Sequence, residues 1–245
     1  MTYCVGLAVD DGLVMLSDSR TNAGMDHIST FRKMTVWERP GERVLTIATS
    51  GNLAITQAVI SRLNDGLPHG EGGEHVTLMD VRTLREAAQL VGRALRDVYA
   101  LDGEAIQEHG AEFSVAMLLG GQIKGDEMGL FHVYTAGNFI EATAETPFFQ
   151  IGETKYGKPI LDRVMTYKTS LEDAAKLALI SMDSTVRSNI SVGLPLDMVM
   201  IRRDELKVSR QVQIDERDPY FRDIQKRWSR ALNAAFERLP ELPWG

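Results

Sequence analysis

Residues 2–20 read TYCVGLAVDDGLVMLSDSR. From Tyr3 to Val9, larger side chains alternate with small ones, and this period of two predicts a strand that is buried on both faces and packed closely on its small side. Asp10-Asp11-Gly12 has the composition of a hairpin turn, and Leu13–Ser17 predicts the returning strand. The chain therefore opens with a buried antiparallel hairpin.

In the rest of the chain, groups of predicted strands alternate with predicted helices. Strands are expected at 34–37, 44–49, 113–119, 129–135, 139–144, 148–151, 198–202 and 206–214, and helices at 53–63, 81–101, 156–165, 171–186 and after Asp218. Residues 20–30 and 68–73 are expected to be loops. Segregated strands and helices favour antiparallel sheets over a doubly wound parallel sheet. We therefore expect one α+β domain over residues 1–245, a four-layer αββα sandwich of two antiparallel sheets flanked by helices.

Composition narrows the class of protein further. The 245 residues carry 27 basic and 34 acidic side chains, a net charge of −7, which argues against a partner with a phosphate backbone. Cys4 is the only cysteine, so no intrachain disulfide is expected. The start lacks the pattern of a signal peptide, and no stretch reaches the ~20 apolar residues of a membrane span. We expect a cytoplasmic protein with neither nucleic acid nor membrane as a partner.

The common motifs of cofactor and metal sites are absent from the sequence. There is no G-x-x-x-x-G-K-[ST] or G-x-G-x-x-G loop for phosphate, and no G-x-S-x-G nucleophile elbow. The five histidines lack the spacing of metal ligands: His27, His69, His75, His109 and His132. His69 and His75 are more simply explained as solvated loop residues than as metal ligands. His132 lies in a predicted strand and is more simply explained as a core or edge residue. No metal or cofactor is expected.

Thr2 is the candidate nucleophile. It follows the initiator methionine and is small, a context that favours methionine removal. Removal leaves a free α-amine and a β-hydroxyl on one residue, and the amine, with an ordinary pKa near 7.7–8.0, can take the hydroxyl proton. Threonine at position two is common, so the assignment depends on its place at the head of a buried strand.

Two further elements support this candidate. Counting back across the turn puts Asp18 beside the start of the first strand, where it can hold Lys33 in place. The charge of Lys33 would favour an alkoxide on Thr2 and would lower the pKa of the α-amine. Gly51, before a predicted helix, can present its N–H to an oxyanion. Each of these residues also has a simpler interpretation when it is taken alone. Ordinary surface charges would explain Asp18, Lys33, Arg20 and Arg32, and an ordinary turn would explain Gly51.

In combination these residues resemble the proteasome β-subunit family of N-terminal-nucleophile (Ntn) hydrolases. Residues 2–6 and 11–20 are similar to the family's T-x-x-[VI]-G…D-G-V-V-L-A-A-D-x-R start, and Lys33 and Ser50-Gly51 follow in the family's order. Residues 114–119, 134–140 and 157–162 resemble later elements, so the likeness covers about residues 2–203. The start and the long C-terminal helix, expected as an extension over 219–245, resemble the bacterial Anbu branch.

The resemblance implies a threonine peptidase or amide hydrolase with Thr2 as nucleophile, supported by Asp18, Lys33 and Arg20, with Gly51 in the oxyanion hole. It implies a peptide or protein substrate, and self-association into a ring or helical oligomer. The chain departs from the family at two places. Gly152-Glu153-Thr154 stands for Gly-Ser-Gly, and Ser188 replaces an aspartate three residues before the matching Ser191. Glu153 is the alternative source of the missing carboxylate near the α-amine.

Two questions remain open at this level. The alternative to an enzyme is a weak or inactive assembly that keeps the fold and cleaves nothing, although retention of Thr2, Asp18 and Lys33 favours the enzyme. The stripe of the closing helix (Phe221, Ile224, Trp228, Leu232 and Phe236) either caps the domain or contacts a second subunit, and we favour the contact. Val9, Thr21 and Thr49 are expected near the pocket. The sequence indicates neither a side-chain preference nor an ATPase partner.

Overall fold

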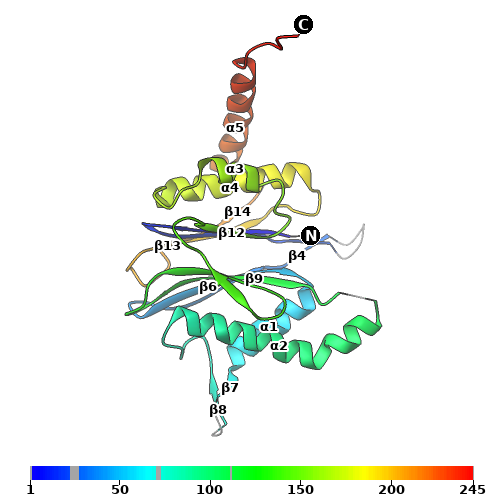
Figure 1. Cartoon of the computed structure of the whole chain (residues 1–245), viewed down its shortest axis with the longest axis vertical. Coiled ribbons are helices and arrows are strands. Elements are labelled where there is room, and N and C mark those ends of the chain that lie inside the picture. Colours follow the sequence, from blue (N-terminus) through cyan, green and yellow to red (C-terminus); the bar gives the residue numbers. More distant parts are fainter. Residues whose placement is uncertain (1, 23–27, 70–72, 111, 245) are drawn as a thin grey trace.

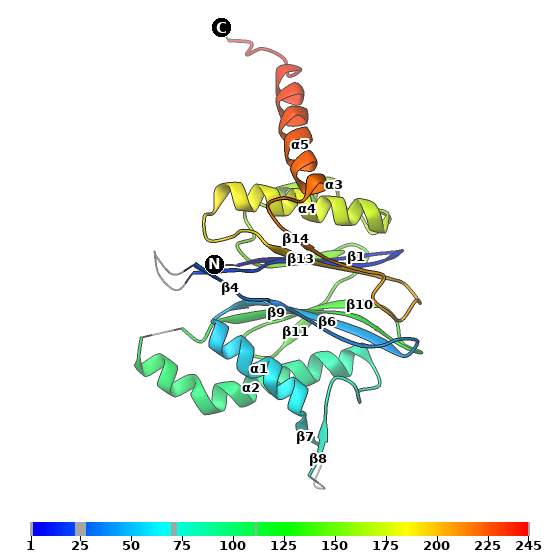
Figure 2. The same cartoon turned by 180° about the vertical axis from the view of Figure 1, so that it is seen from behind.

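Two five-stranded antiparallel sheets lie face to face between two layers of helices (Figure 1). The computed structural model describes residues 2–22, 28–69, 73–110 and 112–244. Helices α3 and α4 cover the outer face of one sheet, and α1 and α2 cover that of the other, as the view from behind also shows (Figure 2). The α+β, four-layer prediction is confirmed.

The first sheet carries the opening hairpin at its centre. Its strand order is β12-β1-β2-β13-β14. The strands are β12 (Phe148–Gly152), β1 (Tyr3–Val9), β2 (Gly12–Asp18), β13 (Leu196–Arg202) and β14 (Arg210–Ile214). In the register of the hairpin Cys4 lies opposite Ser17, which brings Asp18 next to the head of β1, as the sequence predicted.

The second sheet supplies the opposite wall of the space in front of Thr2. Its strand order is β11-β10-β9-β6-β5. The strands are β11 (Phe139–Glu141), β10 (Gly129–Val133), β9 (Val115–Ile123), β6 (Arg43–Gly51) and β5 (Met34–Arg39). Because β6 and β9 are antiparallel, Gly51 at the end of β6 lies opposite Val115 at the start of β9.

Local sequence signals set the starts of the helices. The helices are α1 (Leu53–Asp65), α2 (Leu84–Glu108), α3 (Lys158–Val164), α4 (Leu171–Ser188) and α5 (Pro219–Glu237). The Ser170 side chain accepts from Asp173 N, and the Asp218 side chain accepts from Phe221 N, so both predicted N-caps are confirmed. The long second helix begins at Leu84, later than predicted, because Thr83 is its N-cap.

The alternation of β1 explains how the layers pack. Tyr3, Val5, Leu7 and Val9 are buried against the helix layer of α3 and α4, and Cys4 faces the core between the sheets. On the same inner face, a Cβ added to Gly6 would lie closer than 3.0 Å to Leu130 and Met15. The small side of β1 therefore lets the two sheets approach closely, as the period of two predicted.

Two short hairpins occupy the segments that the sequence analysis treated as loops. One pairs β3 (Arg20–Asn22) with β4 (Ile28–Thr30), and the other pairs β7 (Leu67–His69) with β8 (Glu74–Val76). Their strands have three residues each, too few for a period of two to be visible. His27 lies outside the described residues. In the part of the chain that the structure describes, no helix is long and apolar enough to cross a bilayer.

Candidate active site

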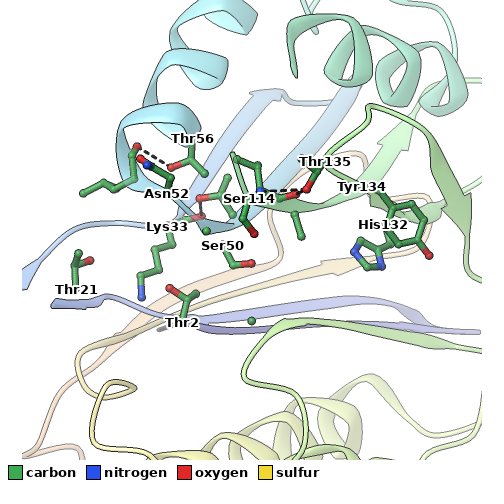
Figure 3. A pocket seen from close by; sticks show the side chains of 16 residues that line it. Thr2, Thr21, Lys33, Ser50, Asn52, Thr56, Ser114, His132, Tyr134 and Thr135 are labelled. Atoms are coloured by element: carbon green, nitrogen blue, oxygen red, sulfur yellow. Dashed lines mark hydrogen bonds between the residues drawn. The ribbon is translucent and has the colours of Figure 1, made fainter. Parts of the chain in front are cut away.

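A cleft opens between the two sheets in front of Thr2, as Figure 3 shows. It has a volume of about 940 Å³, a size typical of ligand sites in proteins. It is bounded by the end of β6 with the start of α1, by the start of β9 and by the end of β10. Its lining residues are Thr2, Thr21, Lys33, Thr49, Ser50, Gly51, Asn52, Leu53, Thr56, Ser114, Val115, Ala116, His132, Tyr134, Thr135 and Gly152.

Thr2 is held through the peptide unit that joins it to Tyr3. Its carbonyl oxygen accepts a hydrogen bond of 2.7 Å from Glu153 N, and the next amide, Tyr3 N, donates to Asp18 Oδ1 over 3.1 Å. The side chain of Tyr3 is fully buried and anchors the strand below. Thr2 itself is only 9% exposed, yet it lines the cleft. A nucleophile at this position is rigid, which is what a reaction at one fixed carbonyl requires.

Lys33 and Asp18 form a buried ion pair directly beside Thr2. Lys33 Nζ lies 2.8 Å from Asp18 Oδ1 and donates to the Arg20 carbonyl over 2.6 Å. Burial raises the pKa of Asp18 above its usual value, and the Lys33 ammonium opposes that rise. The Lys33 side chain ends next to Thr2 in the cleft (Figure 3). An ammonium at this place can stabilise negative charge on a nearby oxygen.

Arg20 acts through its backbone and through a neighbouring loop. Its carbonyl oxygen accepts from Lys33, and its guanidinium donates to the Ile190 carbonyl over 3.1 Å. The same guanidinium packs against Gly193, where a Cβ would lie closer than 3.0 Å to Arg20. Gly193 N in turn approaches Asp18 Oδ2 at 3.4 Å. Arg20 is therefore a positioning residue that ties the α4–β13 loop to the site.

Gly51 lines the cleft at the end of β6. Asn52 N donates to Ser114 O over 3.0 Å, so the alternation of the antiparallel ladder directs the Gly51 N–H away from β9. On that other side lies β5, whose first residue is Met34. The bond from Thr49 N to Lys33 O is made one residue before β5 begins, so the pairing of β6 with β5 does not reach Gly51. The Gly51 N–H therefore faces the cleft, where it can donate to a developing oxyanion.

Replacing Gly51 with alanine tests how tightly this turn is built. Gly51 has a φ of +110°, and a Cβ there would lie closer than 3.0 Å to the Ser114 carbonyl oxygen. Gly41 is the matched control, because its φ is +78° and a Cβ added there would have nothing within 4 Å. We expect Gly51→Ala to lower the free energy of unfolding by about 1–3 kcal/mol more than Gly41→Ala, in urea titrations at equal protein concentration. Equal losses would contradict the close packing.

Glu153 and Asn189 join the two loops behind Thr2. Glu153 is 7% exposed, and its carboxylate accepts from Asn189 Nδ2 over 2.8 Å and pairs with Lys155 at 3.3 Å. Asn189 Oδ1 accepts from Ser191 N over 2.9 Å. Asn189 was missed by the sequence analysis, because its importance comes from contact with a residue 36 positions away.

The two serines singled out in the sequence are placed differently from the cleft residues. Ser188 is exposed at the last position of α4, and Ser191 is half-buried in the following loop; neither is among the residues that line the cleft. Thr21 and Thr49 do line it, whereas Val9 is wrong as a pocket residue, because it is fully buried against the helix layer. Within the described ranges, no cluster of three or more His, Cys, Asp or Glu side chains is arranged to hold a metal ion.

Comparison with known proteins agrees with this geometry. No protein-family model matches the chain. The proteasome subunit beta of Haloquadratum walsbyi is 25% identical over 217 residues, 88% of this chain and 79% of that protein. The Anbu (ancestral β-subunit) structure from Yersinia bercovieri is 49% identical, with a TM-score of 0.90 over 99% of this chain and 100% of that one. The helical assembly of the Anbu complex from Pseudomonas aeruginosa is 46% identical, with a TM-score of 0.90 over 98% of each chain.

Fold and site together define a proteasome-like protein of the Ntn-hydrolase fold. The sandwich of two antiparallel sheets between helices and the likeness to proteasome β-subunits and Anbu structures place the chain in that class. At 46–49% identity over nearly the whole length of solved Anbu structures, the chain belongs to the Anbu, or ancestral β-subunit, family.

Proposed function

We propose that this protein is a threonine-type amide hydrolase of the proteasome kind, acting on peptides or proteins. Removal of Met1 frees the α-amine of Thr2, which takes the proton of the Thr2 hydroxyl. The oxygen attacks the substrate carbonyl, and the Gly51 N–H stabilises the oxyanion. The amine half of the substrate leaves with a proton, and water then hydrolyses the ester on Thr2.

The observation that carries this proposal is the buried Lys33–Asp18 pair beside Thr2. The Lys33 and Asp18 side chains are 5% and 0% exposed, and taking two charges out of water is costly. A purely structural role would be served as well by apolar side chains at these positions. An ammonium held next to a hydroxyl at a cleft is typical of an activated nucleophile.

Glu153 supports the proposal by replacing the carboxylate that Ser188 lacks. Its backbone N–H binds the Thr2 carbonyl, and its buried side chain is held by Asn189. We propose that this carboxylate helps to position the freed α-amine. The exposed Ser188 supports the alternative function, an inactive assembly. The Lys33–Asp18 pair beside Thr2 and the position of Gly51 in the cleft lining favour the hydrolase.

The experiment that tests hydrolysis is digestion of a denatured protein by the wild-type assembly and by Thr2→Ala. We expect new peptide ends, identified by mass spectrometry, with the wild type alone. Identical peptide patterns with both proteins, or no cleavage by a wild type that has lost Met1, would favour the inactive assembly.

Helix α5 supports the second part of the proposal, that the protein works as a homo-oligomer. It projects away from the sandwich in both views (Figures 1 and 2). Its base is anchored: Phe221 and Ile224 are 1% and 9% exposed, and Gln225 donates to Asp183 over 2.6 Å. Large apolar side chains are exposed at the far end of α5, on Leu232 and Phe236, and in the residues that follow the helix, on Leu239, Leu242 and Trp244. Several large apolar side chains exposed near one another along the chain favour a protein interface at this end of the molecule.

Deletion of residues 219–245 is expected to break the assembly, but it would also remove Phe221 and Ile224 from the core. The sharper variant is Leu232→Asp/Phe236→Asp, which places charges on the exposed stripe only. We expect it to sediment as a smaller species, while Asn233→Asp, a charge on the same exposed helix, keeps the wild-type sedimentation coefficient. Unchanged sedimentation of the double variant would exclude the stripe from the interface.

A further inference from the structure

A groove lies on the outer face of the first sheet, between α4 and the edge strand. Helix α4 packs on β1, β2 and β13, and β14 lies beyond β13 at the edge of the sheet. The groove has a volume of about 390 Å³, at the lower end of the size of ligand pockets in proteins, so bulky side chains fit into it. The first two turns of α4 form one of its walls.

The side chains that line this groove suit an apolar occupant. Met198 and Met200 of β13 and Val212 of β14 contribute apolar side chains to it, while Arg210 and Tyr220 are exposed. Methionine is unbranched and flexible, and methionine-rich surfaces adapt to the shape of a partner. We therefore call this feature the methionine groove.

Helix α5 begins at the methionine groove but carries its exposed apolar side chains away from it. Asp218, the N-cap of α5, and Tyr220 in its first turn both line the groove. Phe236 lies 16 residues beyond Tyr220 in the same helix, a distance of about 24 Å at 1.5 Å per residue. The helix projects from the layer of α3 and α4 in both views (Figures 1 and 2). Its far end therefore cannot enter the groove of its own chain, whereas that of a second copy can.

Charge favours one direction for the meeting of two copies. Residues 219–230 carry four basic side chains and one acidic side chain, whereas residues 231–244 carry one basic and two acidic side chains. Two antiparallel α5 helices place the basic half of each beside the acidic half of the other, and parallel helices would place like charges together. In the antiparallel pair, Leu239, just after the end of one helix, comes to the start of the other, where the groove opens.

We propose that the methionine groove receives the far end of α5 from a second copy of this chain, in a dimer whose two α5 helices are antiparallel. Because helix and groove lie at the same end of the molecule, each copy both gives a helix end and receives one. Such a contact is self-complementary and closes on a two-fold axis. This inference rests on the proposed homo-oligomer, to which it adds the surface that α5 contacts and the symmetry of the contact.

Cross-linking between introduced cysteines tests the contact without depending on catalysis. Chains with Arg210→Cys, at the groove, are co-expressed with tagged chains that carry Leu239→Cys, and the purified assembly is treated with a short bis-maleimide. The native Cys4 is fully buried and does not compete for the reagent. We expect a product with the mass of one tagged and one untagged chain. In the matched control Asp65→Cys, exposed at the end of α1 in the other helix layer, replaces Arg210→Cys and should give no such product.

Two results would overturn the groove contact and leave the homo-oligomer standing. The first is an assembly that sediments as the wild type does but in which the Arg210→Cys and Leu239→Cys chains are not linked. The second is a product that joins two Leu239→Cys chains instead, which would show that the helix ends meet each other. A wild type that sediments as a single chain would contradict the homo-oligomer and the groove contact together. The two proposals therefore fail in distinguishable ways.

Discussion

One alanine inserted between Met1 and Thr2 is expected to abolish amide hydrolysis. Removal of Met1 then leaves the free amine on the inserted alanine, and the nitrogen of Thr2 becomes an amide that cannot accept a proton. A positioned general base contributes about 10²–10⁴-fold to a rate, so the loss should be at least about 100-fold. Release of product from a peptide substrate, measured at equal enzyme concentration, gives the comparison.

The matched control for the insertion is Thr2→Ser, which keeps a hydroxyl and an α-amine on one residue. It should retain far more activity than the insertion variant. Both should unfold at the wild-type temperature, because the bonds from Glu153 N to Thr2 O and from Tyr3 N to Asp18 are kept. Wild-type rates in the insertion variant would show that the α-amine of Thr2 is not the base.

Lys33→Met is expected to cost both activity and stability. Asp18 would keep its bonds from Tyr3 N and Gly193 N but lose the ammonium 2.8 Å away, leaving a fully buried carboxylate without a counter-charge. Breaking one partner of a buried ion pair costs about 3–5 kcal/mol of unfolding free energy. Urea unfolding at fixed protein concentration measures this loss, and Lys158→Met, which removes an exposed pair with Asp162, should change almost nothing.

Adding Asp18→Asn to Lys33→Met separates the two effects. The double variant has no charge at positions 18 and 33, so most of the lost stability should return, while hydrolysis stays absent. If stability and activity returned together, Lys33 would be a structural residue. If Lys33→Met kept its activity, the Thr2 oxygen would not depend on the ammonium beside it.

The sequence predicted the parts of the site that depend on local patterns. The alternation of β1 and the turn at Asp10-Asp11-Gly12 indicated the first hairpin, and its register then placed Asp18 beside Thr2. Lys33 and Gly51 were found because each stands next to a strand end. Their roles followed from the chemistry of an N-terminal threonine, and the resemblance to a known family implied the same roles.

The parts that local patterns could not give all depend on contacts between distant segments. Glu153 meets Thr2 because β12 pairs with β1, and the two strands are almost 150 residues apart. Asn189 became a candidate only through its bond to Glu153. Periodicity indicates which face of a strand is buried, but strand order decides which residues meet.

The most direct test of the central claim is the intact mass of the chain after reaction with a peptidyl epoxyketone. This reagent forms its adduct with a hydroxyl and a free amine on one residue, so it reports the unmasked Thr2 itself. The wild type should have lost Met1 and gained one probe, and Thr2→Ala should gain none. A wild type that has lost Met1 but stays unlabelled, or a Thr2→Ala chain labelled equally, would contradict Thr2 as the nucleophile.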